Sequence, residues 1–318
     1  MVNITSFEDT YYYPPPQLRE GLDALVRFPD GEFKRNSIPN SSIWVYNPAK
    51  HRYNPGIFSG DAGCGIAAFS IDEVNPKEAA DIIFKKLAGK GILGRGNHFV
   101  DICGAYESAI PNTEQKYPHN IILVHTHGGN LDITIPATIA EAQKRQQYAE
   151  GFREYLGHQL ATDIGSRSCE ILGNWTHNSV EETEEGIIYR KGVVKVQQNK
   201  IHILPANIGE KIIFYTVSDE APFKLPKYSS MPHATGRAGP RGKMKVSIDE
   251  IKKMRRQKWI PYIPSGISDT ALRSEHPSCF NNFDRIFERL RYPASKHFTE
   301  NYFLVTAEAR ILSYVGKV

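Results

Sequence analysis

A glycine-rich segment near residue 60 places an acid and a thiol three residues apart. The segment reads Ser-Gly-Asp-Ala-Gly-Cys-Gly, and it leads from Asp61 and Cys64 into an apolar run. Asp offers a hard oxygen ligand and Cys a thiolate that can bridge two metal ions, and the glycines allow the backbone to bring both groups to one point. The pattern indicates a metal-binding turn ahead of a buried strand. The same pattern also fits a tight turn with a buried structural cysteine.

Three histidines stand at comparable places further along the chain. His98, His125 and His177 each lie in a turn or at the edge of a predicted strand. A single histidine is commonly a satisfied core or surface residue, so the prediction depends on the whole set. Together with Asp61 and Cys64 they form a mixed donor set for two transition-metal ions that share the thiolate. Such donors fit Mn, Zn or Fe, and the order of affinities does not choose among them.

A basic, glycine-rich loop over residues 231–245 contains one more histidine, His233. Backbone N–H groups exposed by its glycines, together with Arg237, Arg241 and Lys243, could hold a phosphate. A neutral imidazole in such a loop can act as a nucleophile toward phosphorus. The alternative interpretation is a solvated surface loop, because glycine with Arg and Lys is also typical of exposed loops.

The elements that must position these groups follow from apolar periodicity and from capping residues. Asn75-Pro76 and the pair Ser247 and Glu250 are helix-start signals, the second a capping box. The predicted elements are helices over residues 17–28, 75–87, 137–161, 247–258 and 280–290, strands over 66–71, 121–125, 170–175 and 310–318, and antiparallel hairpins over 186–217. We predict an α+β fold, with largely antiparallel sheets flanked by helices, in a single domain over residues 1–318, of which 1–27 form an N-terminal extension.

The composition is that of an ordinary globular protein. The chain has 318 residues with 40% hydrophobic and 23% charged residues, and its net charge of +4 permits a polyanionic partner without demanding one. Its four cysteines form no Cys-x-x-Cys pair, so neither a disulfide framework nor a zinc ribbon is expected. No apolar run reaches about 18 residues, and no signal peptide is evident at the start. We therefore expect a soluble, cytoplasmic protein.

In this order, the motifs resemble the RtcB family of RNA-splicing ligases, which join RNA ends with GTP and manganese. The resemblance extends from about residue 28 to the C-terminus. The blocks that carry it are Phe28-Pro29-Asp30, Gly60-Asp61-Ala62-Gly63-Cys64-Gly65, Leu93-Gly94-Arg95-Gly96-Asn97-His98-Phe99, Val124-His125, His177-Asn178 with Glu181, Tyr189-Arg190-Lys191-Gly192, His233-Ala234-Thr235-Gly236-Arg237, and the terminal stretch that ends in Lys317. The resemblance implies a central metal and nucleotide cleft.

The resemblance also implies roles for individual residues. Cys64 would bridge two Mn²⁺ ions, with Asp61, His98, His125 and His177 completing their coordination. His233 would accept GMP, and Asp30 would orient it. The guanylate would lie against Asn97, His98, Phe99, Asp101, His177, Asn178, Pro205, Ala206, Asn207, Ile208, His233, Ala234, Thr235, Gly236, Phe280 and Lys317. RNA phosphates would contact Arg190, Lys191, Arg237 and Arg241.

The implied reaction has three steps. His233 attacks the α-phosphorus of GTP, which forms a phosphoramidate and releases pyrophosphate. An RNA 3′-phosphate, made from a 2′,3′-cyclic phosphate by hydrolysis, then takes the GMP. Finally, a 5′-hydroxyl attacks this activated end and GMP leaves. The implied partner is RNA with broken or spliced ends, tRNA included, and the implied role is RNA splicing or repair.

Some positions depart from the family pattern. Residues 125–130 read His-Thr-His-Gly-Gly-Asn where the family has His-Ser-Gly-Ser-Arg-Gly, so Gly129 replaces an arginine that would hold a substrate phosphate. Asp101 replaces a glutamate, and Phe280 replaces a tyrosine that stacks on guanine. Two alternatives therefore stand beside the ligase: a metal-dependent phosphoesterase that opens or cleaves RNA ends without joining them, and a non-catalytic RNA-binding relative.

Overall fold

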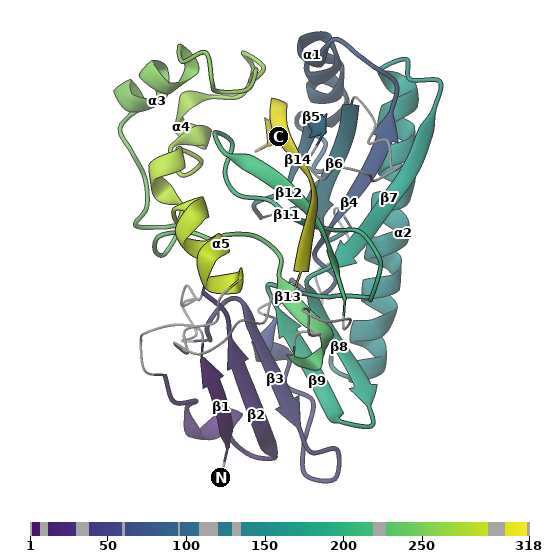
Figure 1. Cartoon of the computed structure of the whole chain (residues 1–318), viewed down its shortest axis with the longest axis vertical. Coiled ribbons are helices and arrows are strands. Elements are labelled where there is room, and N and C mark those ends of the chain that lie inside the picture. Colours follow the sequence, from purple (N-terminus) through teal and green to yellow (C-terminus); the bar gives the residue numbers. More distant parts are fainter. Residues whose placement is uncertain are drawn as a thin grey trace.

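A computed structural model describes residues 2–6, 12–29, 38–58, 61–94, 96–107, 120–128, 135–218, 227–291 and 303–316. Its largest sheet has seven strands in the order β11-β12-β14-β5-β6-β4-β7, and every neighbouring pair is antiparallel (Figure 1). The strands are β4 (Gly65–Ile71), β5 (Phe99–Glu107), β6 (Asn120–Thr126), β7 (Cys169–Thr176), β11 (His202–Leu204), β12 (Lys211–Val217) and β14 (Phe303–Gly316).

A second sheet has five strands in the order β1-β2-β3-β9-β8. They are β1 (Asn3–Ser6), β2 (Leu22–Arg27), β3 (Ser42–Tyr46), β8 (Asn178–Thr183) and β9 (Gly186–Lys191), and only the β1–β2 pair is parallel. The short strands β10 (Val193–Lys195) and β13 (Ser230–Pro232) form a separate antiparallel pair. His177 alone separates β7 from β8, so the chain passes from one large sheet to the other at this residue.

The helices are α1 (Pro76–Leu87), α2 (Ile139–Asp163), α3 (Ile248–Arg255), α4 (Asp269–Leu272) and α5 (Phe283–Arg291), with 3₁₀ turns η1 (Pro16–Leu18), η2 (Pro55–Ile57), η3 (Lys227–Ser229) and η4 (Pro277–Cys279). The long helix α2 lies along β7 and β4 at one side of the molecule (Figure 1). The start signals act as expected: Asn75 accepts hydrogen bonds from the first turn of α1, and Ser247 and Glu250 form the capping box of α3.

The two large sheets share one hydrophobic cluster. It takes Val26, Ile43 and Val45 from the five-stranded sheet and Ile66 and Ala68 from the seven-stranded sheet. Alternate residues of β4, such as Phe69, point to the opposite face, where they join apolar side chains of α1, α2 and α3 in a second cluster. A third cluster covers the outer face of the five-stranded sheet. Because side chains alternate between the two faces of a strand, each large sheet has an apolar cluster on both of its faces.

The predicted α+β class with largely antiparallel sheets is confirmed. The helices near 75–87, 137–161, 247–258 and 280–290 are present, and so are the strands near 66–71, 121–125, 170–175 and the C-terminus. The helix over 17–28 is wrong: residues 22–27 form β2 between β1 and β3. Both faces of this strand are buried, so its apolar residues run almost continuously and imitate helical spacing.

No helix within the described ranges combines the length and the apolar character needed to cross a lipid bilayer.

Candidate metal centre

Four neighbouring antiparallel strands bring the predicted ligands together at one end of the seven-stranded sheet. His98 directly precedes β5, His125 is the penultimate residue of β6, Cys64 directly precedes β4, and His177 directly follows β7. Phe99 pairs with His125, and Gly65 pairs with both Thr126 and Thr176. Because neighbouring strands run in opposite directions, the starts of β5 and β4 lie beside the ends of β6 and β7.

The side chains converge as well as the backbones. Ligand atoms of Cys64, His125 and His177 all lie within 4.8 Å of one another, and all three residues are buried. The Cys64 sulfur is 3.4 Å from Nε2 of His125 and 3.5 Å from Nε2 of His98. This buried group of one thiol and two imidazoles could hold a metal ion, and His98 stands beside it as a further donor.

Burial sets the protonation of these groups. It raises the pKa of Cys64 to about 12, and the nearby Asp61 carboxylate acts in the same direction. Burial also lowers the pKa of His125 and of His177 well below the ordinary value. The two imidazoles are therefore neutral at pH 7, which is the form that binds a metal, whereas the thiol must release its proton when it becomes a ligand.

The backbone beside His98 leaves room for its imidazole. Gly96 has φ of +143°, and a Cβ there would lie 2.9 Å from Cε1 of His98. A side chain at this position would displace the imidazole from the sulfur. The hydroxyl of Thr126 donates to the carbonyl of Leu93 and so ties the end of β6 to this turn. The glycines between Gly91 and His98 thus serve the approach of a ligand, as the sequence pattern indicated.

Asp61 lies at the same cavity but outside the close group. Its backbone carbonyl accepts a hydrogen bond of 3.1 Å from Nδ2 of Asn178, and Oδ1 of Asn178 accepts one of 2.9 Å from the amide of Gly192. Asn178 therefore connects the metal turn to the segment beside His233. The donor chemistry present, one thiol with several imidazoles and a carboxylate nearby, fits Mn, Zn or Fe.

His233 belongs to the same row of rings. Its ring centroid lies 4.1 Å from that of His177, which in turn lies 5.2 Å from that of His125. Nδ1 of His233 is 2.8 Å from the carbonyl oxygen of Gly192. Since a carbonyl only accepts, Nδ1 donates and Nε2 carries the lone pair. The candidate nucleophile thus lies directly beside the candidate metal ligands.

A cavity of about 230 Å³ contains most of the predicted site. The predicted residues that line it are Asp61, Cys64, Asn97, His98, Phe99, His125, His177, Asn178, Lys191, Pro205, Ala206, His233, Ala234, Gly236, Arg237, Arg241 and Phe280. The segments come from far apart in the chain. The fold places them around one cavity.

Several predicted residues do not line this cavity. Asp101 is buried within β5, and burial, with Glu275 nearby, raises the pKa of its carboxyl well above the usual range. Asn207 caps a turn by accepting from the amide of Gly209, and Ile208 packs in the cluster beside α3. Thr235 is fully buried. Asp30 and Lys317 lie outside the described residues.

Arg237 is held inside the protein. Its Nη2 lies 3.1 and 3.0 Å from the two carboxylate oxygens of Glu275, and its Nη1 donates to the carbonyl of Ser274. Its guanidinium also stacks 4.4 Å from the ring centroid of Phe280. The ring predicted to stack on guanine is therefore covered by Arg237 on one face. Arg241, by contrast, is partly exposed, with Nη2 3.9 Å from Glu275.

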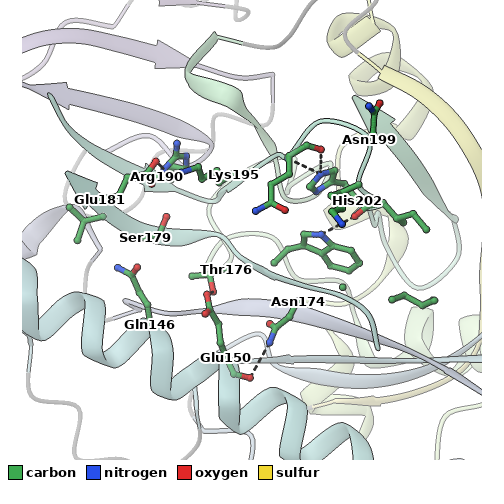
Figure 2. Close-up of a pocket in the computed structure, with 17 residues that line it drawn as sticks. Gln146, Glu150, Asn174, Thr176, Ser179, Glu181, Arg190, Lys195, Asn199 and His202 are labelled. Atoms are coloured by element: carbon green, nitrogen blue, oxygen red, sulfur yellow. Dashed lines mark hydrogen bonds and ion pairs between the residues drawn. The ribbon is translucent and has the colours of Figure 1, made fainter. Parts of the chain in front are cut away.

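Arg190 and Lys191, which were predicted to contact RNA phosphates, lie at the end of β9 and line different cavities. Arg190 does not line the cavity of the candidate metal centre, and its Nη1 is 2.6 Å from Oε1 of Glu181. It lines a separate groove of about 550 Å³ beside α2 (Figure 2). Lys191 is buried at the metal cavity, where its ammonium donates to the carbonyl of Phe58. Alternation along the strand explains the difference.

Several neighbours of the candidate centre were not among the predicted site residues. His127 is buried, and its ring centroid lies 4.6 Å from that of His98. Gly192 provides the carbonyl that orients His233. Arg153 of α2 is fully buried behind the ligands. The signal for His127 was its place two residues after His125, directly beyond the end of β6. Arg153 gave none, because it belongs to a helix that was interpreted as scaffold.

The comparisons with known proteins add nothing to this geometry. A scan against models of protein families finds no match to the chain, and a search of curated proteins finds no similar sequence.

Proposed function

We propose that the chain is a GTP- and Mn²⁺-dependent RNA ligase of the RtcB type, which joins RNA 3′-phosphate or 2′,3′-cyclic phosphate ends to 5′-hydroxyl ends. One observation carries the proposal: the imidazole of His233 lies beside the buried Cys64, His125 and His177 group, in one cavity. A nucleophile next to a thiolate and imidazole metal site is the arrangement that guanylate transfer to histidine needs.

Each group has a role in this proposal. Cys64, His98, His125 and His177 would hold manganese, with Asp61 at the edge of the same cavity. Bound Mn²⁺ supplies positive charge that neutralises phosphate oxygens. The carbonyl of Gly192 keeps the proton on Nδ1 of His233, so Nε2 presents its lone pair to the α-phosphorus of GTP. The ammonium of Lys191 adds a buried positive charge at the cavity.

The test is self-labelling of the purified protein. We expect incubation with GTP labelled at the α-phosphate and Mn²⁺ to attach GMP to wild-type protein, and the His233→Ala variant to remain unlabelled. His158→Ala is the control, since His158 is exposed on α2 and does not line the cavity, so it should not change labelling. Equal labelling of the His233→Ala variant would refute the proposal.

A second function, phosphoester hydrolysis without joining, is favoured by one feature of the site. Two of the arginines predicted to grip RNA phosphates, Arg190 and Arg237, are committed to the carboxylates of Glu181 and Glu275. A metal centre with few available cations could hydrolyse an RNA end that it holds only weakly. This function predicts that a 2′,3′-cyclic phosphate end is opened without GTP and that no joined RNA forms. Joining that depends on GTP would reject it.

A further inference from the structure

A single buried arginine donates hydrogen bonds to a neighbour of each residue in the cysteine and histidine group. Arg153 of α2 is fully buried. Its Nη1 donates to the carbonyl oxygens of Gly63, at 2.8 Å, and of Thr126, at 3.1 Å. Its Nη2 donates to the hydroxyl of Thr176 at 2.8 Å, and its Nε donates to Oδ1 of Asn174 at 2.7 Å. The guanidinium thus joins α2 to three separate strand ends.

Three of these acceptors lie directly beside the residues of the candidate metal site. Gly63 directly precedes Cys64, Thr126 directly follows His125, and Thr176 directly precedes His177. One rigid, planar group therefore fixes the spacing of the three segments that carry the ligands. Lysine could not do the same, because it offers a single point of charge in place of a fork.

The two side chains of β7 that accept from Arg153 are themselves bound to Glu150 of α2. The Thr176 hydroxyl donates to Oε1 of Glu150 at 2.7 Å, and Nδ2 of Asn174 donates to the backbone carbonyl of Glu150 at 3.0 Å. Figure 2 shows Glu150, Asn174 and Thr176 together at the wall of the large groove beside α2. The network therefore runs from this groove through Arg153 to the residues beside the candidate metal ligands.

The backbone of β4 is adapted to the arginine. A Cβ on Gly65 would lie 2.7 Å from Cζ of Arg153 and 2.6 Å from the carbonyl oxygen of Trp175. Only glycine allows the guanidinium to lie against the strand directly after Cys64. The glycine that follows the metal turn in the sequence thus makes room for Arg153.

We propose that Arg153 is the positioning residue of the metal centre, and that Thr176 transmits its hold to His177. The inference rests on the metal site of the proposed function, although it does not depend on GTP or RNA. Residues that orient metal ligands typically contribute about 10- to 100-fold to metal affinity. We assign a contribution of this size to Arg153.

The test is a titration of full-length, metal-free protein with Co²⁺, followed by its thiolate-to-metal absorption and its ligand-field bands. We expect Arg153→Lys to weaken Co²⁺ binding by about 10- to 100-fold and to change the ligand-field spectrum. Arg256→Lys, at the exposed end of α3, is the matched control and should behave as wild type. Thermal unfolding in EDTA separates loss of the fold from loss of the site.

A second pair of variants keeps the proposal open to refutation if Arg153→Lys does not fold. Thr176→Val removes the hydroxyl at nearly constant volume and should weaken Co²⁺ binding, whereas Thr176→Ser keeps the hydroxyl and should not. Wild-type affinity and an unchanged spectrum in Thr176→Val, or in folded Arg153→Lys, would overturn the proposal. Wild-type protein that binds Co²⁺ but is not labelled by GTP would refute only the ligase function. Wild-type protein that binds no Co²⁺ would refute both.

Discussion

Nδ1 of His233 and the carbonyl oxygen of Gly192 are 2.8 Å apart. The same carbonyl also accepts from the backbone amide of His233 and from the hydroxyl of Ser41. This carbonyl fixes both the place and the tautomer of the imidazole. The resemblance to the RtcB family implied that role for Asp30, which lies outside the described residues.

The first prediction concerns Gly192. Its φ is +65°, and an added Cβ would lie 2.8 Å from Oδ1 of Asn40. We expect Gly192→Ala to lower the free energy of unfolding by about 1–3 kcal/mol and to reduce GMP labelling of His233, because the carbonyl would move. Urea denaturation and labelling with GTP measure the two effects. Gly242→Ala is the control, since nothing lies within 4 Å of its added Cβ, and an equal loss in that variant would contradict the prediction.

The second prediction concerns the thiol. We expect Cys64→Ser to lower the affinity for divalent metal by at least about tenfold, because a hydroxyl is a far poorer ligand than a thiolate. The fold should persist, since the side chains are nearly isosteric. Isothermal titration with Mn²⁺ and circular dichroism check both statements. Cys169→Ser, at the far end of β7, should bind metal as wild type does. Undiminished binding by the Cys64 variant would return this cysteine to a packing role.

The third prediction compares two arginines of the basic loop. Arg237 is buried against Glu275, so Arg237→Ala leaves a buried carboxylate without this partner and should cost about 3–5 kcal/mol of stability. Arg241 is partly exposed and lies 3.9 Å from the same acid, so Arg241→Ala should cost less than about 1 kcal/mol. Urea unfolding of the two variants measures the loss of unfolding free energy in each. Similar losses in both would show that the ion pair of Arg237 is not the stabilising one.

The fourth prediction concerns pH. Burial lowers the pKa of His51 to about 4, while its ring stacks on Tyr46 and its Nε2 lies 2.7 Å from the hydroxyl of Tyr189. In the unfolded chain the pKa is about 6.5, so the unfolded state binds the proton first as the pH falls. The stability that His51 contributes should therefore decline between about pH 6.5 and pH 4.

The measurement is the difference in unfolding free energy between wild type and His51→Gln across that range. We expect this difference to shrink as the pH falls, and the subtraction removes the contribution of the other histidines. A difference that stays constant from pH 7 to pH 4 would show that His51 is not held neutral by the fold.

Local chemistry explains which parts could be predicted from sequence. Asn75, Ser247 and the long apolar runs act within a few residues, so the elements they mark were confirmed. The strand over 22–27 was missed because burial on both faces removes the alternation that identifies a strand. The pairing of Arg190 with Glu181 and of Arg237 with Glu275 depends on contacts that no local pattern records. The convergence of Cys64 and His125 follows from antiparallel strand order, which periodicity alone does not give.

His177 is the only residue between β7 of one large sheet and β8 of the other. A metal ion bound by Cys64 and His177 would therefore link the start of β4 to the point at which the chain passes between the two sheets. Ligands that bind only the folded state add to its stability in proportion to the logarithm of their concentration. A metal ion that binds there should accordingly raise the free energy of unfolding, so the candidate site would contribute to the stability of the fold as well as to chemistry.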